Sequence, residues 1–235
     1  MRMPLELVAS PGTLYRVGRS PSPFVWRRPR IALADSVDPH DGYRWDAPNA
    51  DFATLYCATR PLGSLVETLA YYRRDADFAA MLHSATDDDE PDPEYDFAVA
   101  RGLVPRSYFE RVLGQGRLDP KHRFIDVDHP RTHAQLTEEL PDLLTRHGVR
   151  HFDRGVMMTQ DRRITRTVAG HLYSQAAATA TGIRYASRVH GGLECWALWE
   201  HCDEHLTDRE STPLTPEHPE VKQAAELLEL QLPHS

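Results

Sequence analysis

The chain has 235 residues, of which 40% are hydrophobic and 26% are charged, so it can bury one sizeable core. Its net charge of −8 argues against a broad surface for binding nucleic acid or anionic membranes. No apolar run approaches the roughly 20 residues of a membrane helix, and the N-terminal apolar stretch is too short for a signal peptide.

The first third of the chain predicts two short strands and one helix. Residues 1–12 form a lead-in, and Thr13–Val17 has the β-branched and aromatic content of a strand. A second short apolar strand is expected at Ala53–Ala58. Pro61 then opens a helix over 61–74, because the missing N–H of proline costs nothing in the first helical turn.

Tyr56 and Glu67 are placed near one another by this strand–turn–helix unit. Tyr56 lies in the strand, and Glu67 follows eleven residues later in the helix. The apolar residues of the helix recur at helical spacing, and Glu67 lies just beside their stripe. Glu67 can therefore border the core and face a cleft, and we expect the active site to be built around this pair.

The rest of the chain mixes strands and helices without a regular βαβ alternation. The acidic segment 75–94 predicts an exposed loop. Further strands are expected at 95–104, 123–127, 183–186 and 195–199, and helices at 133–144 with a break at Pro141, at 161–177 and at 219–230. This order indicates an α+β fold, a mixed sheet with flanking helices. We expect one catalytic domain over 13–205, with 75–94 as an insertion, and a C-terminal extension over 206–235 with a packing helix.

Five polar residues at strand ends, on the helix and in turns suit a nucleotide. Arg16 and Arg44 have the forked side chain that grips phosphate. The ring of Tyr56 can stack on a flat heterocycle. Glu67 can hold a ribose hydroxyl and stabilise a developing oxocarbenium cation, and Ser187 can hydrogen-bond a ligand or orient a nucleophile. Together they suit a dinucleotide such as NAD. No G-x-G-x-x-G follows a strand, so hydride chemistry on a Rossmann domain is not indicated.

Each of these residues, taken singly, also has an ordinary structural explanation. Tyr56 fits an apolar core, and Glu67 fits a charged helix surface near the N-terminus, where the helix dipole favours it. Arg44 and Ser187 are typical of a surface and a turn. The residues alone therefore support only a candidate nucleotide site, and a catalytically silent nucleotide-binding module is an alternative.

A zinc hydrolase is a second alternative. The segment from His201 to His205 reads H-x-x-E-H, in which the two histidines would bind zinc and Glu204 would act as the base. The segment follows an apolar strand and precedes a polar stretch that contains prolines, which does not favour the long helix this motif requires. With 13 histidines in the chain, a chance match is unsurprising.

Four short motifs occur in a fixed order and span about Thr13 to Trp199. They are L-Y-R at 14–16, Y-R-W at 43–45, L-Y-C-A-T…L-V-E-T-L at 55–69 and G-I-R-Y-A-S-R at 182–188. In this order they resemble the RES domain family, the toxins of RES–Xre toxin–antitoxin pairs. Three positions depart from the family pattern: Tyr43 replaces a glycine, Asp46 stands where asparagine is frequent, and Ala186 replaces a proline.

The resemblance implies a fold similar to ADP-ribosyltransferase toxins and an enzyme that degrades NAD⁺ by cleaving the nicotinamide–ribose bond. The acceptor would be inorganic phosphate or water, with no cofactor or metal. By the same resemblance, Arg44 and Arg16 would hold phosphates and Tyr56 would stack on nicotinamide. Glu67 would bind the ribose and stabilise the transition state, and Ser187 would line the site.

The partners implied are NAD⁺ and an Xre-type antitoxin protein that covers the cleft. No direct binding of nucleic acid and no membrane association are expected. Cys57, Cys195 and Cys202 are odd in number and include no C-x-x-C pair, which favours reduced thiols in a cytoplasm.

Overall fold

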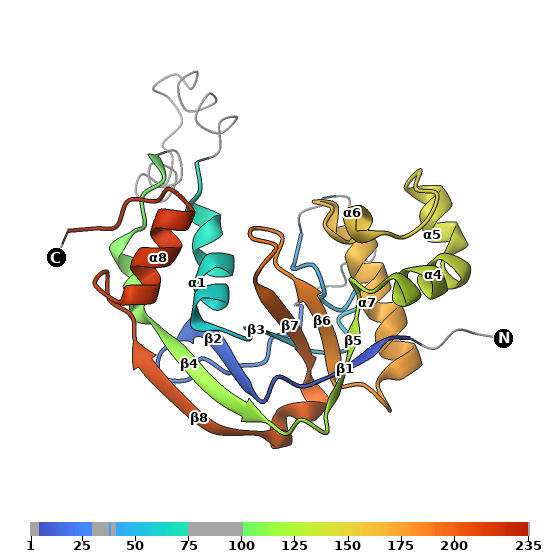
Figure 1. The fold of residues 1–235 in the computed structure, drawn as a ribbon, viewed down its shortest axis with the longest axis horizontal. Helices are drawn as coiled ribbons and strands as arrows, with labels where there is room; N and C mark the ends of the chain where they lie inside the picture. Colours follow the sequence, from blue (N-terminus) through green and yellow to red (C-terminus); the bar gives the residue numbers. More distant parts are fainter. Residues whose placement is uncertain (1–4, 30–37, 39–40, 75–100, 235) are drawn as a thin grey trace.

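The computed structural model describes residues 5–29, 38, 41–74 and 101–234 (Figure 1). Their strands form one eight-stranded sheet in the order β1-β5-β6-β7-β3-β2-β4-β8. The strands are β1 (Leu7–Ala9), β2 (Thr13–Arg19), β3 (Thr54–Ala58), β4 (Arg111–Leu118), β5 (Arg123–Asp126), β6 (Gly182–Ala186), β7 (Glu194–Trp199) and β8 (Leu206–Pro213). The β5–β6 pair is parallel and the other described pairs are antiparallel, so the predicted mixed sheet is confirmed.

Helices gather at both ends of this curved sheet (Figure 1). The helices are α1 (Pro61–Leu69), α4 (Pro130–Glu139), α5 (Pro141–Arg146), α6 (Arg154–Met157), α7 (Arg162–Ala176) and α8 (Pro219–Leu227), with 3-10 turns η1 (Ala70–Tyr72), η2 (Arg106–Glu110) and η3 (Glu200–His205). In Figure 1, α1 and α8 lie together at one end and α4 to α7 at the other, with β6 and β7 between them.

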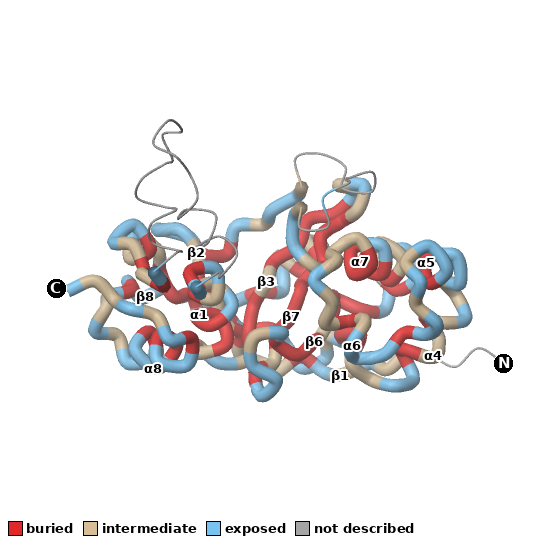
Figure 2. Tube along the Cα trace, turned by 90° about the horizontal axis from the view of Figure 1, so that it is seen from above, coloured by how far each residue is buried: buried red, intermediate tan, exposed pale blue. Residues whose placement is uncertain are grey.

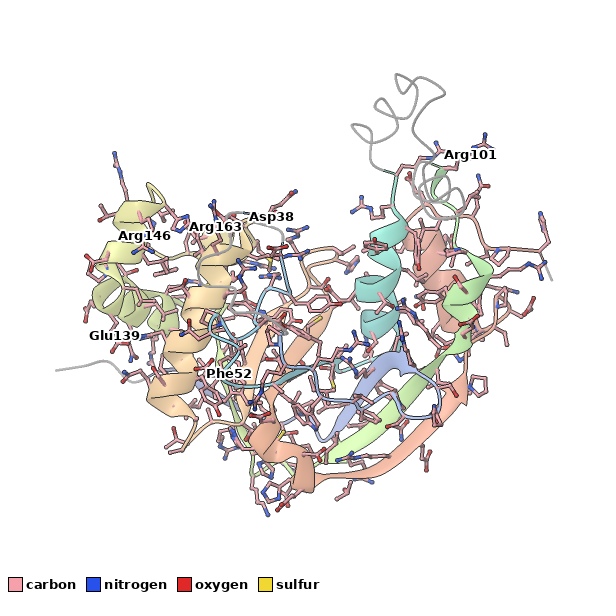
Figure 3. All side chains as sticks on the ribbon, turned by 180° about the vertical axis from the view of Figure 1, so that it is seen from behind. Asp38, Phe52, Arg101, Glu139, Arg146 and Arg163 are labelled. Atoms are coloured by element: carbon pink, nitrogen blue, oxygen red, sulfur yellow. The ribbon has the colours of Figure 1, made fainter. Side chains whose placement is uncertain are left out.

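Three apolar clusters hold these layers together, and Figure 2 shows the buried residues concentrated along β3, β7, β6 and α7. One cluster packs α7 against β6 and β7, where Phe52, labelled in Figure 3, stacks on Tyr173 with ring centroids 4.2 Å apart. A second packs α1 against α8 and β2. A third fills the other face of the central strands, around Trp196. Burial of these apolar surfaces drives the assembly.

Several predicted helices are confirmed, and residues at their ends explain where they begin or stop. Asp161 precedes α7 and its side chain accepts a hydrogen bond from the Arg163 N–H at 3.0 Å, which caps the helix. The break at Pro141 is also present, since α4 ends at Glu139 and α5 begins at Pro141. A proline cannot donate the hydrogen bond that would continue the first helix.

Three strands were not predicted, and one prediction was wrong. Strand β1 lies in the segment 1–12, which is expected above to be a lead-in, and pairs with β5 at one edge of the sheet. Strands β4 and β8 pair with each other, and β8 is the other edge of the sheet. The segment 206–235 therefore adds a strand to the sheet, and its helix α8 packs beside α1. Residues 101–104 do not form a strand: Leu103 makes a single bridge with Gln231. The rest of the strand expected at 95–104, and the acidic segment 75–94, lie outside the described residues.

The cysteines are buried and free. Burial raises the pKa of the thiols of Cys57 and Cys202 to about 12, and it also raises the pKa of Cys195.

Among the residues that the structure describes, no helix combines the length and apolarity needed to cross a bilayer.

Candidate functional site

The turn that precedes β3 is fastened to α7 through its main chain. Arg162 and Arg166, one helical turn apart on α7, donate to the carbonyl oxygens of Gly42 and Asp41. The turn also closes on itself, since the Asp46 N–H donates to the Tyr43 oxygen at 3.3 Å. Gly42 has φ +63°, a left-handed conformation that glycine adopts without strain. The residues that follow are therefore held against the sheet.

Arg44 projects from this turn between two aromatic rings. Its guanidinium carbon lies 5.3 Å from the ring centroids of both Trp45 and Tyr185. Nη2 donates to the Met157 carbonyl oxygen, whereas Nε and Nη1 are buried and have no partner among the described residues. Buried donors without partners cost free energy, so this guanidinium is suited to bind an anion.

Tyr56 on β3 is tied to the same turn by its hydroxyl group. The hydroxyl donates to Asp46 Oδ1 at 2.8 Å and accepts from the Trp45 N–H at 3.0 Å. The other carboxylate oxygen of Asp46 accepts from the Tyr43 N–H at 2.8 Å. Burial raises the pKa of the Tyr56 phenol well above its ordinary value and also raises the pKa of the Asp46 carboxyl. The Tyr56 hydroxyl thus fixes the turn, in addition to any role of its ring.

Glu67 on α1 is in direct contact with Ser187, which follows β6. The Ser187 hydroxyl donates to Glu67 Oε1 at 2.5 Å and accepts from the N–H groups of Val189 and His190 at 3.1 and 3.2 Å. Ser187 is 1% exposed, whereas Glu67 is exposed. Ser187 therefore orients one carboxylate oxygen, while the rest of the carboxylate faces solvent.

Arg16 on β2 donates hydrogen bonds to two main-chain carbonyl groups, one of which is that of Tyr56. Its Nε donates to the Pro23 carbonyl oxygen at 2.8 Å, and its Nη1 donates to the Tyr56 carbonyl oxygen at 2.7 Å. Burial lowers the pKa of this guanidinium. Two of its nitrogens are thus engaged with main chain, and Arg16 supports the strand that carries Tyr56.

The structure brings Arg44, Tyr56, Glu67 and Ser187 into one region and adds residues that sequence reasoning missed. Tyr185 on β6 is buried, which raises the pKa of its phenol; the charge of Glu67 raises this pKa further and that of Arg44 lowers it.

Arg188, next to Ser187, belongs to the same electrostatic environment. Partial desolvation lowers its pKa, the Arg44 cation lowers it further, and Glu67 opposes both effects. The charges of Arg44, Arg188 and the exposed Glu67 therefore influence one another at this site. The sequence carried one signal for Tyr185 and Arg188, their place inside the motif G-I-R-Y-A-S-R.

A hollow of about 370 Å³ lies close by but on the other face of the β6–β7 pair. Arg184, Ala186 and Glu194 line it, together with the start of α1. Side chains alternate along a strand, so these residues point away from Tyr185. Arg184 is ion-paired there with Asp126 and Glu194, at 3.1 and 2.9 Å. None of the five predicted site residues lines this hollow.

The H-x-x-E-H segment forms the 3-10 turn η3 and not an α-helix. In it, His201 Nε2 is 3.2 Å from the Ala180 carbonyl oxygen, and the ring of His205 lies 4.7 Å from that of His122. In the part of the chain that the structure describes, no three histidine, cysteine or acidic side chains are arranged to hold a metal. The geometry of this segment does not support the zinc hydrolase.

Comparison with known proteins agrees with the order of the motifs. A model of the RES domain matches residues 13–219, which include all five predicted site residues. Among solved structures, the chain is similar to the M. tuberculosis MbcT–MbcA toxin–antitoxin complex, with 16% identity and a TM-score of 0.47, over 95% of this chain and 92% of that one. Comparison with curated proteins gave no match.

Proposed function

Because the chain belongs to the RES domain family, we propose that it degrades NAD⁺ by cleaving the bond between nicotinamide and ribose. One observation carries the proposal. The exposed carboxylate of Glu67, oriented by Ser187, shares one site with the guanidinium of Arg44, of which two buried nitrogens have no partner among the described residues. A carboxylate suits a developing positive charge, and a guanidinium suits a phosphate, so the pair matches a nucleotide whose ribose becomes cationic.

The reaction assigned to this site is a glycosyl transfer. The bond between the ribose C1′ and the nicotinamide nitrogen breaks, its electron pair stays with nicotinamide, and the ribose gains oxocarbenium character. Glu67 stabilises that cation because its charge is present before the reaction begins. Arg44 holds a phosphate of the substrate. Water or inorganic phosphate then forms the new bond to C1′, and no metal or organic cofactor is required by this scheme.

We assign the enzyme to a toxin–antitoxin pair on the strength of the family. An antitoxin protein, of Xre type by the resemblance described above, would cover the site and prevent loss of cellular NAD⁺. We propose that this activity takes place in the cytoplasm.

Consumption of NAD⁺ by the purified chain tests the proposal. Nicotinamide and the ribosyl product are followed with and without inorganic phosphate. Phosphate-dependent release of nicotinamide, with an ADP-ribose product that carries the phosphate at that same C1′, identifies a phosphorylase, and release without phosphate identifies a glycohydrolase. Folded protein that binds NAD⁺ and releases no nicotinamide under either condition would instead establish the silent binding module.

A further inference from the structure

Tyr43 presents an aromatic ring to solvent at the edge of the candidate site. The residue is 56% exposed, although it precedes the half-buried Arg44 and the fully buried Trp45. Its ring centroid lies 5.5 Å from that of Tyr56, and the two planes are tilted by 54°. Tyr56 thus supports the ring of Tyr43 from one side, and solvent reaches the remainder.

The main chain that carries this ring is fixed. The Tyr43 N–H is bonded to Asp46, whose carboxylate is itself bonded to the Tyr56 hydroxyl. The carbonyl group of the preceding Gly42 accepts from Arg162 on α7. An exposed ring on a fixed main chain loses little conformational entropy when a ligand stacks on it.

The neighbouring charge indicates what such a ligand carries. Arg44, the next residue, places its guanidinium 5.3 Å from the ring of Tyr185, and its positive charge attracts an anionic group to the site that Tyr43 borders. A flat ring joined to a phosphate through a short linker describes a nucleotide. Tyr43 also stands where the RES pattern has a glycine, so the ring is a property of this chain and not of the pattern.

We propose that Tyr43 is a specificity-determining residue that stacks on a heteroaromatic ring of the nucleotide. The proposal rests on the nucleotide site of the proposed function and adds to it a second aromatic surface beside Tyr56. The ring that stacks on Tyr43 is flat, and it is either electron-poor or a purine. In NAD⁺, nicotinamide and adenine are the two rings of this kind. Stacking of a base on an aromatic side chain contributes enough to change affinity about tenfold or more.

Binding by variants of position 43 tests the proposal. Tyr43→Leu removes the ring and keeps an apolar side chain, whereas Tyr43→Phe keeps the ring and serves as the matched control. Both are made in the Glu67→Gln background so that substrate is not consumed, and dissociation constants for NAD⁺, AMP and nicotinamide mononucleotide are measured by calorimetry. Thermal unfolding of each variant verifies that the fold is intact, which is expected because Tyr43 is exposed.

The expected result is a loss of NAD⁺ affinity of about tenfold in the leucine variant and less than about twofold in the phenylalanine variant. A parallel loss for AMP assigns the stacked ring to adenine, and a parallel loss for nicotinamide mononucleotide assigns it to nicotinamide. Equal NAD⁺ affinity in the leucine and tyrosine proteins overturns the role of Tyr43 and leaves the proposed reaction standing.

The same experiment separates this proposal from the proposed function. If the protein without these substitutions releases no nicotinamide, but AMP binding still depends on a ring at position 43, the reaction is wrong and the stacking role stands. If none of the three nucleotides binds to any of the variants, the stacking role is overturned as well.

Discussion

The hydroxyl of Ser187 donates a 2.5 Å hydrogen bond to Oε1 of Glu67 and joins two segments that lie 120 residues apart in the chain. The serine is itself held, because its oxygen accepts from the N–H groups of the two residues that follow Arg188. The carboxylate on α1 is therefore positioned by the turn that follows β6. A charge that is oriented before the reaction needs no reorganisation as the transition state forms.

Replacing Glu67 by glutamine should lower the turnover of NAD⁺ about a hundredfold or more and leave the fold intact. The amide oxygen can still accept from Ser187, so the contact survives, but the negative charge is lost. Nicotinamide release and the midpoint of thermal unfolding are the two measurements. Glu226→Gln, an exposed glutamate on the neighbouring α8, is the matched control and should keep its activity. Turnover near that of the control would exclude Glu67 from the chemistry.

Replacing Arg44 by lysine should weaken binding of phosphate-bearing ligands about tenfold, because a single ammonium group cannot reproduce the fork of a guanidinium. The dissociation constants of NAD⁺ and nicotinamide mononucleotide are expected to rise. That of nicotinamide riboside, which has no phosphate, should stay within about twofold. A uniform loss across all three ligands would mean that Arg44 shapes the turn and does not bind phosphate.

Replacing Tyr56 by phenylalanine should lower the free energy of unfolding by about 1–3 kcal/mol, because the buried carboxylate of Asp46 loses its hydroxyl donor. Chemical denaturation measures this change. The ring remains, so NAD⁺ affinity should fall much less than in Tyr56→Ala. If phenylalanine and alanine weaken NAD⁺ binding equally, the hydroxyl and the turn it holds matter for binding and the ring does not.

The three cysteines should resist alkylation in the folded protein. Burial raises the pKa of Cys57 and Cys202 to about 12 and also raises that of Cys195, so each remains a thiol at pH 8, and the thiolate is the nucleophile. Mass spectrometry after brief treatment with iodoacetamide at pH 8 should find the native chain unmodified and the urea-denatured chain modified three times. Rapid modification of any cysteine in the native chain would show that its burial is transient.

The sequence by itself determined the elements whose pattern is local. The helix α7 follows from its apolar spacing and the cap of Asp161, and the start of α1 follows from Pro61. The mixed fold class and the order of the four motifs were also readable, because each motif contains its own residue pattern.

Only the tertiary structure decided where the sheet ends. In β4, Gly114 and Gly116 weaken the strand pattern of the sequence. A Cβ at Gly114 would lie 2.3 Å from Pro23 Cγ. Glycine is therefore required there, because the segment with Pro23 crosses the strand closely. In β8, the described side chains after Leu206 are exposed, up to Pro213, so no alternation of apolar residues marks the strand. Charged residues are typical of an edge strand that must not pair with another chain.

The assembly of the site was likewise decided by tertiary structure. The sequence determined that Arg44, Tyr56, Glu67 and Ser187 are present and in which motifs they stand. The contacts among these four residues depend on the pairing of β3 with β7 and of β7 with β6. This pairing brings the turn after β6 to α1. A hydrogen bond between residues 120 positions apart depends on the path of the whole chain, and local preferences of the residues carry no information about it.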